Sequence, residues 1–580
     1  AQRFVLTPKS FGQESLTTGI YSFGNNNYRI SSLGNGVYTI YSLTQNGFCA
    51  ANGNGSMYFA ASSDAAEAKW LVTKTSDGYV FQSAAHQTYM TSDAGLSNNA
   101  ENISISDLNA SVTDYSVKYD LSALNALDSL NGIQVISRLH TLGLSRSDLM
   151  NPEANMTSLN TNIQSALSGL PTQTVQYTGT DVDDLNQFLQ NNTGKIVQLT
   201  QDIQVYKNTN GSFGIIMVPS DTILDGNGHR LVMKAGYTEA PDVGVVLYVY
   251  KDGVIPSTNC GVKNLSTDIP YVNSINVFSA DNILIENNTL NNATKSGIMI
   301  SDEYGSTVNG IIRGNTINNV GDDAIAVYGN HSNLLIDSNR ISGAKGFAGI
   351  AISCLQNGQQ IRVDNETTGP HDIIVTGNVV SGCSGEALYC IGSYKTYITY
   401  NTLRDSILEG VCLDSGCIGN YFAHNEVVNN GIAGGLPGVS IDNGIYNIVD
   451  SNNVYNNSCS GIKLVRTGLG NIIVNNICTD NAYNQMGAKS SGIDIEPLAV
   501  ETENLGYIDG LGSNWNVVLN NTVTGSHDFG VFIADDDTAN NGGSSCENVI
   551  MYNKFSSAYT FGAADFSSMS STVKNNITLN

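Results

Sequence analysis

The sequence predicts an all-β chain built mainly of one parallel β-solenoid, with a small β-rich module and a short helical segment before it. Three observations support this prediction. Glycine occurs 59 times, charged residues make up only 13% and hydrophobic residues 41%, which suits many short buried strands joined by turns. From about residue 215 an apolar line with a turn Asn recurs. A second apolar line follows each copy in the same order, which indicates a repeat that stacks upon itself.

Residues 1–115 are expected to form the β-rich module. Tyr and Gly alternate with short strand patterns such as GVYTIYS and AKWLVTKTSDGYVFQS. Strands, turns and aromatics at this spacing resemble a β-trefoil, lectin-like module, and the resemblance implies a sugar-binding role. Trp70 is then either a platform for a sugar or, as a large aromatic residue, part of the core.

Residues 116–171 are expected to be helical. Leu121, Leu124, Leu127 and Leu130 have helical spacing, and Asn151 before Pro152 predicts an N-cap followed by proline at the first helical position. We expect this segment to pack on the solenoid or to cap its first rung, which would otherwise expose an open sheet edge. Residues 172–205 then supply a leading helix and the first strand of the solenoid.

Residues 172–580 are expected to form a solenoid of about 10–11 coils. The first line places Asn at one position of every repeat, where its amide can bond to the backbone of the next rung: Asn288, Asn315, Asn339, Asn378, Asn401, Asn425, Asn452, Asn476, Asn521 and Asn553. The second line includes SGIMIS (296–301), EGVCLD (409–414), PGVSID (437–442) and SGIDIE (491–496). Alternating inward Ile or Val with variable outward residues has the period of a strand.

This series, led in by TILDGNGHRL (222–231), resembles the right-handed parallel β-helix repeats of the pectin-lyase-like superfamily over roughly residues 200–580. The resemblance implies a carbohydrate-related function. The superfamily includes hydrolases, lyases, epimerases and phage tailspikes, so the fold alone does not choose among them. We expect the glycosidase branch.

Acidic residues share columns of the second line. Adjacent rungs lie about 4.8 Å apart, so Asp414 should neighbour Asp442, and Glu386 should neighbour Glu409. Three interpretations compete: a glycosidase pair of carboxylates, a Ca²⁺ site, and Asp residues that only end strands. We favour the glycosidase pair, with Asp414 and Asp442 as the acids and Glu409 in support. Substrate contacts are expected from the same face, at Tyr389, Lys463, Glu386, Asp494, Glu496 and Tyr328.

The stretch VGDDAIAVYGN (320–330) forms a second candidate site. Gly-Asp-Asp before such a strand is similar to the paired-Asp motif of polygalacturonase-type hydrolases, which implies catalytic roles for Asp322 and Asp323, with Asp302 on the preceding rung. The Gly-His-Gly and Arg-Ile-Lys motifs of those enzymes have no counterpart on the expected rungs. A turn interpretation of the two Asp residues is therefore equally open.

Net charge limits the partners. A formal charge of −25 disfavours nucleic acid, anionic membranes and polyanionic glycans, and no apolar run is long enough to span a bilayer. The ten cysteines lack metal-site spacing, so buried thiols are expected, with one or two disulfides as the alternative.

We therefore expect a secreted glycoside hydrolase, whose leader has been removed, acting on a neutral or amino-sugar glycan. No cofactor is required, although Ca²⁺ is an option, for instance at Asp535, Asp536 and Asp537. Inserts at 354–371 and 497–513 are expected to wall the cleft. A uronate lyase or epimerase is the first alternative, and a non-catalytic glycan-binding adhesin or tailspike is the second. The sequence leaves the oligomeric state open.

Overall fold

A computed structural model shows two compact units, Ala1–Lys118 and Tyr119–Asn580. The structure describes residue 16 and residues 19–579, except 25, 34–35, 43–44, 46, 61–65, 94, 108–123, 129–133, 208–213, 248, 251–253, 256, 304, 355–368, 483–490, 497–511, 535–544, 546, 557–558, 560 and 568–570. The inserts expected to wall a cleft and the triple Asp at 535–537 fall mostly or wholly outside the described residues.

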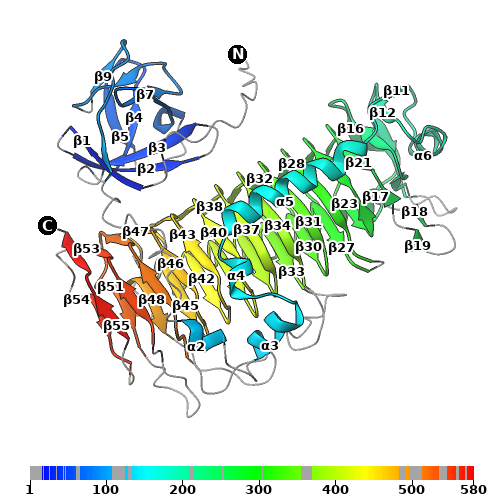
Figure 1. The fold of residues 1–580 in the computed structure, drawn as a ribbon. Helices are drawn as coiled ribbons and strands as arrows, with labels where there is room; N and C mark the ends of the chain where they lie inside the picture. Colours follow the sequence, from blue (N-terminus) through cyan, green and yellow to red (C-terminus); the bar gives the residue numbers. More distant parts are fainter. Residues whose placement is uncertain are drawn as a thin grey trace. The chain divides into compact units, whose positions relative to one another are not determined.

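The first unit contains one sheet in which every strand pairing is antiparallel (Figure 1). Trp70 is fully buried there, and its Nε1 donates to the Cys49 carbonyl at 2.8 Å, so Trp70 is a core residue. Besides the 3₁₀ turn η1 (Ala66–Ala68), the strands are β1 (Gly19–Phe23), β2 (Asn26–Ser32), β3 (Val37–Ser42), β4 (Gly47–Ala51), β5 (Met57–Ala60), β6 (Trp70–Lys74), β7 (Tyr79–Ser83), β8 (Tyr89–Met90), β9 (Leu96–Ser97) and β10 (Ser106–Asp107).

The second unit is a parallel β-solenoid of three long sheets, which confirms the predicted fold (Figure 1). Sheet I has 15 strands: β11 (Thr174–Tyr177), β12 (Ile196–Leu199), β15 (Ile223–Asp225), β21 (Gly261–Lys263), β25 (Ile283–Glu286), β28 (Val308–Arg313), β31 (Ser332–Asp337), β34 (His371–Thr376), β37 (Tyr394–Thr399), β40 (Tyr421–Ala423), β43 (Ile448–Asp450), β46 (Ile472–Val474), β49 (Val517–Leu519), β52 (Val549–Met551) and β55 (Thr572–Lys574).

Sheet II has 14 strands: β13 (Ile203–Val205), β16 (Arg230–Met233), β22 (Ser266–Thr267), β26 (Thr289–Asn291), β29 (Thr316–Asn318), β32 (Arg340–Ser342), β35 (Val379–Ser381), β38 (Thr402–Arg404), β41 (Glu426–Val428), β44 (Asn453–Tyr455), β47 (Ile477–Thr479), β50 (Thr522–Thr524), β53 (Lys554–Ser556) and β56 (Ile577–Leu579).

Sheet III has 13 strands and contains the second line of the repeat: β14 (Ile216–Val218), β17 (Val243–Leu247), β23 (Asn273–Phe278), β27 (Ile298–Ser301), β30 (Ile325–Tyr328), β33 (Ile350–Ser353), β36 (Leu388–Ile391), β39 (Val411–Asp414), β42 (Val439–Asp442), β45 (Ile462–Val465), β48 (Ser491–Glu496), β51 (Phe529–Ile533) and β54 (Phe561–Asp565). Short pairs outside the sheets are β18 (Val249–Tyr250) with β19 (Val254–Ile255), and β20 (Ser257–Thr258) with β24 (Ala280–Asp281). The solenoid is thus longer than the 10–11 coils expected, because its first turns lack the full repeat.

Side chains alternate between the solenoid core and the outer face. Along sheet III the core receives Ile298, Leu413 and Ile441 and their equivalents, all fully buried. Between them, Tyr389, Cys412, Ser440 and Lys463 point outward in one column, as their register shows. The burial of Val, Ile and Leu on every rung is the main force that holds the coils together.

The predicted Asn column forms a continuous hydrogen-bonded ladder. Asn425 is representative: its Nδ2 donates to the Ile398 carbonyl at 2.8 Å and to Asn452 Oδ1 at 3.1 Å, and its Oδ1 accepts from the Asn401 backbone N–H at 2.8 Å. Each amide therefore satisfies backbone groups of a buried turn that water does not reach.

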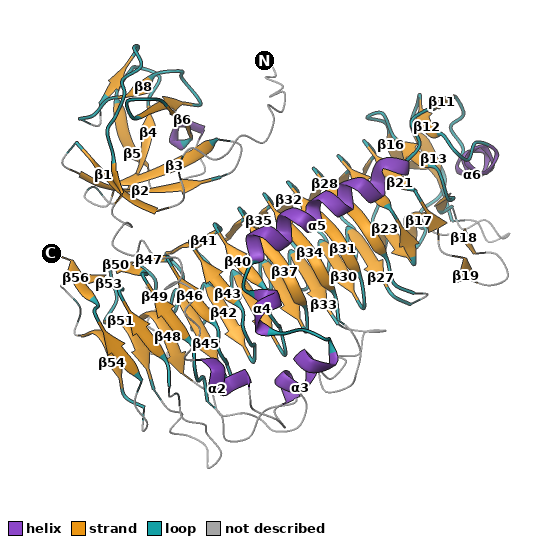
Figure 2. Ribbon diagram, in the orientation of Figure 1, coloured by secondary structure: helices purple, strands orange, loops and turns teal. Residues whose placement is uncertain are grey.

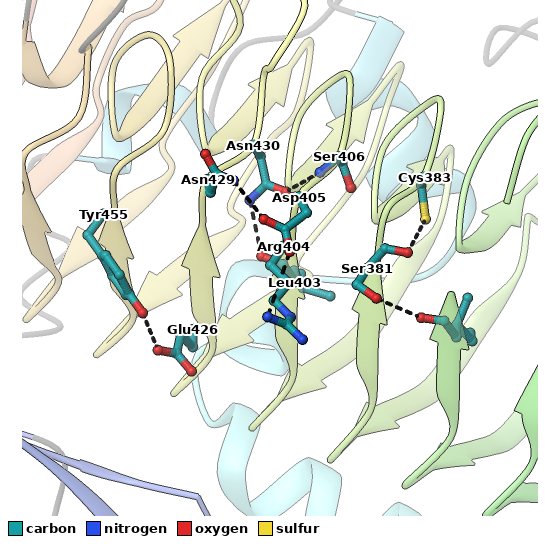
Figure 3. Close-up of polar contacts among 11 residues, drawn as sticks. Ser381, Cys383, Leu403, Arg404, Asp405, Ser406, Glu426, Asn429, Asn430 and Tyr455 are labelled. Atoms are coloured by element: carbon teal, nitrogen blue, oxygen red, sulfur yellow. Dashed lines mark hydrogen bonds and ion pairs between the residues drawn. The ribbon is translucent and has the colours of Figure 1, made fainter. Parts of the chain in front are cut away.

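Two further ladders were not recognised in the sequence. One runs along the turn before sheet I through Asn420, Asn447, Asn471, Asn516 and Asn548. The other runs after sheet II, where Asn430 Nδ2 donates to Asn457 Oδ1 at 3.1 Å and to the Leu403 carbonyl at 3.0 Å. Figure 3 shows Asn430 between Ser406 and Leu403, beside the Asn429–Asp405 and Tyr455–Glu426 hydrogen bonds on the neighbouring rungs.

The helical segment belongs to the solenoid unit. Its helices are α2 (Asn125–Asp128), α3 (Gln134–Thr141), α4 (Arg146–Leu149) and α5 (Pro152–Ala166), followed by the 3₁₀ turn η3 (Leu167–Gly169). Helix α5 begins at Pro152 with Asn151 as its N-cap, as predicted. It lies along the outer face of sheet I and contacts β28, β31, β34 and β37, so it spans four rungs rather than covering the end (Figure 2).

The buried residues of this segment form a second core with the outer face of sheet I. Leu159 and Ile163 of α5 pack with sheet residues that include Leu335 and Ile374. Leu124 and Leu127, two of the four predicted helical leucines, are fully buried in the same core. Leu121 and Leu130 lie outside the described residues.

A different helix, α6 (Val182–Asn191), packs at the first rungs. Val182, Leu185 and Leu189 are fully buried in the solenoid core, and Asp181 caps the helix by accepting from the Asp183 N–H at 3.0 Å. Strand β11 precedes this helix, so the expected order of leading helix and then first strand is wrong. The apolar face of α6 supplies the cover that the first turn of parallel strands needs.

Candidate functional site

The structure confirms the register on which the predicted site depends. Asp414 pairs with Asp442, and the outward column through Tyr389, Cys412, Ser440, Lys463 and Asp494 is continuous. The acids therefore lie on the outer face of sheet III, where each side chain neighbours its equivalent on the next rung.

Asp414 and Asp442 share one cation. Arg466 Nη1 lies 3.0 Å from Asp442 Oδ2 and 3.8 Å from Asp414 Oδ1. Asp414 also accepts hydrogen bonds from the Tyr389 hydroxyl and the Ser415 hydroxyl, each at 2.7 Å. Three donors thus face Asp414, whereas Asp442 keeps one buried oxygen, Oδ1, without a hydrogen-bond partner.

The electrostatics of Asp442 favour a proton. Burial raises the pKa of Asp442 well above its ordinary value, the charge of Asp414 raises it further, and Arg466 opposes this. Two ionised carboxylates on neighbouring rungs repel each other, which favours the protonated form of Asp442.

Lys463 serves a second pair of acids. Its Nζ lies 3.0 Å from Asp494 Oδ2 and 3.4 Å from Glu496 Oε2, with Asp494 fully buried. Burial alone would lower the pKa of Lys463, but the carboxylates of Asp494 and Glu496 raise it above its ordinary value. Lys463 is therefore a firmly charged, paired lysine.

Glu386 and Glu409 are a third pair, on consecutive rungs, where the Ala387 N–H donates to the Glu409 carbonyl. Glu386 is 6% exposed, and its Oε2 has no hydrogen-bond partner. Burial, followed by the charge of Glu409, raises the pKa of Glu386 to about 8, and burial followed by Asp414 raises that of Glu409 to about 7. Both carboxyls therefore titrate near neutral pH.

The Gly-Asp-Asp site lies on an earlier rung. Asp323 is fully buried, accepts from the Ala348 N–H at 2.8 Å and receives a short hydrogen bond from the Tyr328 hydroxyl. Burial raises the pKa of Asp323 to about 7. Its bonds tie the turn to the neighbouring rung, while Asp322 remains half-buried beside it. The structure does not bring Asp322 and Asp323 onto the rungs of Asp414 and Asp442.

Three residues near the acids were not committed to the site from sequence. Arg466 comes one residue after Val465, which pairs with Asp442 on the neighbouring rung, so its position was readable from the sequence but the direction of its side chain was not. Phe347 packs edge-on against Tyr389, with ring centroids 4.9 Å apart. Arg138 of α3 is buried and donates to the carbonyls of Gly416 at 2.6 Å and Gly392 at 2.5 Å.

Arg138 acts on the turns that follow two strands of sheet III. Gly392 comes directly after β36, and Gly416 comes two residues after Asp414. The guanidinium thus fixes the backbone beyond both Tyr389 and Asp414. No sequence pattern could indicate a contact across 278 residues.

The described residues contain no group of three or more His, Cys, Asp and Glu side chains that could hold a metal ion. The nine described cysteines are buried and unpaired with one another. Within the same part of the chain, no helix is long and apolar enough to cross a membrane.

Comparisons with known proteins agree with the fold. The family described as right handed beta helix region matches residues 253–368. No curated protein sequence matches the chain. Together with the three parallel sheets, the family match confirms a right-handed parallel β-helix.

Several solved structures are similar at low identity. An Azotobacter vinelandii mannuronan C-5 epimerase A-module is 15% identical, with 69% of this chain and 98% of that chain covered and a TM-score of 0.39. A mutant tailspike protein of E. coli bacteriophage HK620, in complex with a hexasaccharide, is 15% identical over 68% and 73%, with a TM-score of 0.42. The catalytic domain of a GH87 α-1,3-glucanase in complex with nigerose is 13% identical over 70% and 69%, with a TM-score of 0.39.

Proposed function

We propose that this right-handed parallel β-helix protein is a secreted glycoside hydrolase that binds a poly- or oligosaccharide along the outer face of sheet III. The observation that carries the proposal is the pairing of Asp414 with Asp442 on adjacent rungs around Arg466. Two carboxyl groups with different environments are the machinery that glycosidic bond cleavage requires.

The environments assign the roles. Asp414 accepts hydrogen bonds from Tyr389 and Ser415, so it serves as the carboxylate that attacks the sugar or activates water. Asp442 carries the proton, because burial and the neighbouring Asp414 raise its pKa. Its buried Oδ1 has no hydrogen-bond partner and is therefore the oxygen that holds this proton before it is transferred to the glycosidic oxygen.

The register favours a retaining reaction. Neighbouring strands lie about 4.8 Å apart, close to the roughly 5–5.5 Å of retaining pairs and below the roughly 6.5–9.5 Å of inverting pairs. Asp442 then protonates the leaving oxygen as the bond from C1 breaks, and Asp414 forms a bond to C1. Water attacks C1 in the second step and gives its proton to Asp442, which frees Asp414.

Neighbouring side chains would contact the glycan. The proposed substrate contacts are Tyr389, Lys463, Glu386, Glu496 and Tyr328. Asp494, also expected from the sequence, is fully buried and would act by holding Lys463 in place. The Tyr389 and Phe347 rings add an apolar surface suited to the C–H face of a sugar. The reaction uses carboxyl groups alone and requires no cofactor.

The charges favour a hydrolase over a uronate lyase or epimerase. Those reactions need cations for the uronate carboxylate and the enolate. Lys463 already pairs with Asp494 and Glu496, and Arg466 already pairs with both catalytic acids. An anionic sugar would therefore face mostly acids.

The test is a panel of aryl glycosides and oligosaccharides with the wild type, Asp414→Asn and Asp442→Asn. We expect released sugar with the wild type and a loss of at least about 100-fold in each variant. Asp184→Asn, an exposed carboxylate on α6, should retain full activity. Ultraviolet absorbance of an unsaturated uronate would establish a lyase instead, and glycan binding without any product would establish a non-catalytic binder.

A further inference from the structure

The outer face of sheet III contains three neighbouring pairs of acids, of which only two have a cation. Asp414 and Asp442 share Arg466, and Asp494 and Glu496 share Lys463. The third pair, Glu386 and Glu409, forms no ion pair with any Lys, Arg or His of the described residues. A buried acidic pair without a cation is costly unless a proton or a ligand supplies the positive charge.

A second observation indicates a ligand at this pair. Glu386 is more than nine-tenths buried, yet its Oε2 has no hydrogen-bond partner. Buried polar atoms are normally bonded, and the exceptions gather where a ligand or a reacting group completes the set. Glu386 and Glu409 also lie on the rungs of β36 and β39, the strands that contain Tyr389 and Asp414.

Aromatic rings beside the pair narrow the class of cation. Tyr389 belongs to the same rung as Glu386, and Phe347 packs edge-on against it. The Gly385 N–H, next to Glu386, donates to the Phe347 carbonyl at 2.9 Å, so the backbone of Phe347 runs beside Glu386, and the Phe347 ring reaches the pair through its contact with Tyr389. A hard divalent cation needs about six to eight oxygen ligands, which two carboxyls and two rings do not provide. An ammonium group suits both carboxylates and aromatic faces.

We propose that Glu386 and Glu409 form a subsite for the ammonium group of an amino sugar with a free amine, next to the Asp414–Asp442 pair. This inference rests on the proposed function only in that the protein binds a glycan, and it does not depend on the hydrolysis reaction. Three N–H donors of the ammonium would satisfy Glu386 Oε2 and the Glu409 carboxylate. The Tyr389 and Phe347 rings would exclude water beside them.

Proton release should accompany binding. At neutral pH the pair retains a proton, because burial raises the pKa of Glu386 to about 8 and that of Glu409 to about 7. An ammonium favours the ionised carboxylates and expels this proton. The other titratable groups near the pair are Asp323, Asp414, Asp442, Tyr389, Cys383 and Cys412. Burial raises the pKa of Tyr389 and of both cysteines, so these three stay neutral in this range.

The experiment measures binding of glucosamine and galactosamine oligosaccharides, as free amines and as N-acetyl derivatives, by titration calorimetry at pH 7. Asp414→Asn is the background, so that the sugars stay intact. We expect about tenfold or stronger preference for the free amine, as removal of charged hydrogen bonds usually costs at least that factor. Titrations in buffers of different ionisation enthalpy, corrected for the protons that the neutral fraction of the amine takes up, should show release of about one proton from the pair per amine bound.

Two isosteric variants test the assignment. In that background, Glu386→Gln and Glu409→Gln should each abolish most of the preference and the proton release, while Glu303→Gln, the same substitution at an exposed side chain, should change neither. Glutamine replaces one member of a pair that retains a proton in the fold, and it keeps the size of the side chain, so the variants should fold. Equal affinity for amine and N-acetyl forms, or a preference that survives both variants, would overturn the proposal. Hydrolysis of neutral glycans without amine preference would overturn this subsite alone.

Discussion

Replacement of Arg466 by methionine should move the pH dependence of catalysis. The guanidinium is the cation shared by the two proposed catalytic acids, 3.0 Å from Asp442 and 3.8 Å from Asp414. Methionine keeps much of the volume of the side chain and removes the charge. Without this charge, burial and the charges of Asp414 and Glu409 still raise the pKa of Asp442, and the opposing effect of Arg466 is lost.

The distances set the size of the shift. Unit charges about 4 Å apart interact by about 4 kcal/mol at the effective dielectric near a protein surface. Arg466 retains 28% side-chain exposure, so solvent screens part of this. An opposite charge at such range typically lowers an acid's pKa by about 1–3 units. We therefore expect the pKa of Asp442 to rise by about one unit in Arg466→Met.

The assay is the pH profile of kcat/KM on the best glycan substrate. Because Asp442 must be protonated to act as the acid, activity falls as pH rises through its pKa, and the alkaline limb should move up by about one pH unit. Arg340→Met, an exposed arginine on β32, should leave the profile unchanged. An alkaline limb that stays in place in Arg466→Met would refute the electrostatic role of Arg466.

Three further predictions concern residues that support the fold and the site. Arg138→Met should lower kcat about tenfold with little change in KM, because it removes the hydrogen bonds to the carbonyls of Gly392 and Gly416. These carbonyls lie just beyond the strands that contain Tyr389 and Asp414. An unaltered kcat would show that the Arg138 contacts do not position the site. Asn425→Ala should lower the free energy of unfolding by about 1–3 kcal/mol in denaturant titrations, because it leaves buried backbone groups without partners. The control, Asn191→Ala at an exposed position, should lower it by less than about 0.5 kcal/mol. Equal losses of unfolding free energy in the two variants would contradict the role of the ladder. Glu386→Gln should match the wild type in melting temperature at pH 4 and exceed it at pH 8. The folded-state pKa of Glu386, about 8, makes the wild type lose stability as pH rises from about 4 to 8, and glutamine does not ionise. Parallel curves of melting temperature against pH would contradict the raised pKa of Glu386.

The fold was predictable because its repeat makes a local signal regular. The Asn column and the alternation of the second line fixed the strand register, and the structure reproduces it from Ser301 to Glu496. The ladder through Asn420 and Asn447 escaped notice, although Asn directly precedes each strand of that part of sheet I. The predicted number of coils was too small, because insertions in the early turns of the solenoid break the spacing of the repeat.

The site was only partly predictable, for a different physical reason. The strand register placed Asp414 beside Asp442 and Glu386 beside Glu409, because residues at the same position of successive coils are neighbours wherever the register is constant. The cation beside the two aspartates depends on the direction of a long side chain, that of Arg466. The contacts of Arg138 with the backbone beyond the site come from a helix that is distant in sequence. Spacing alone also left Asp323 ambiguous. In the structure one of its oxygens accepts from the Ala348 N–H of the next rung and the other from the Tyr328 hydroxyl.

Labelling of the nucleophile tests the central proposal most directly. A 2-fluoro aryl glycoside of the sugar that the panel identifies should inactivate the wild type, and mass spectrometry should locate one added sugar on the peptide that contains Asp414. Asp442→Asn should label more slowly at the same residue. A label on another acid, or full hydrolytic activity in Asp414→Asn, would contradict the assignment of these two aspartates as the catalytic pair.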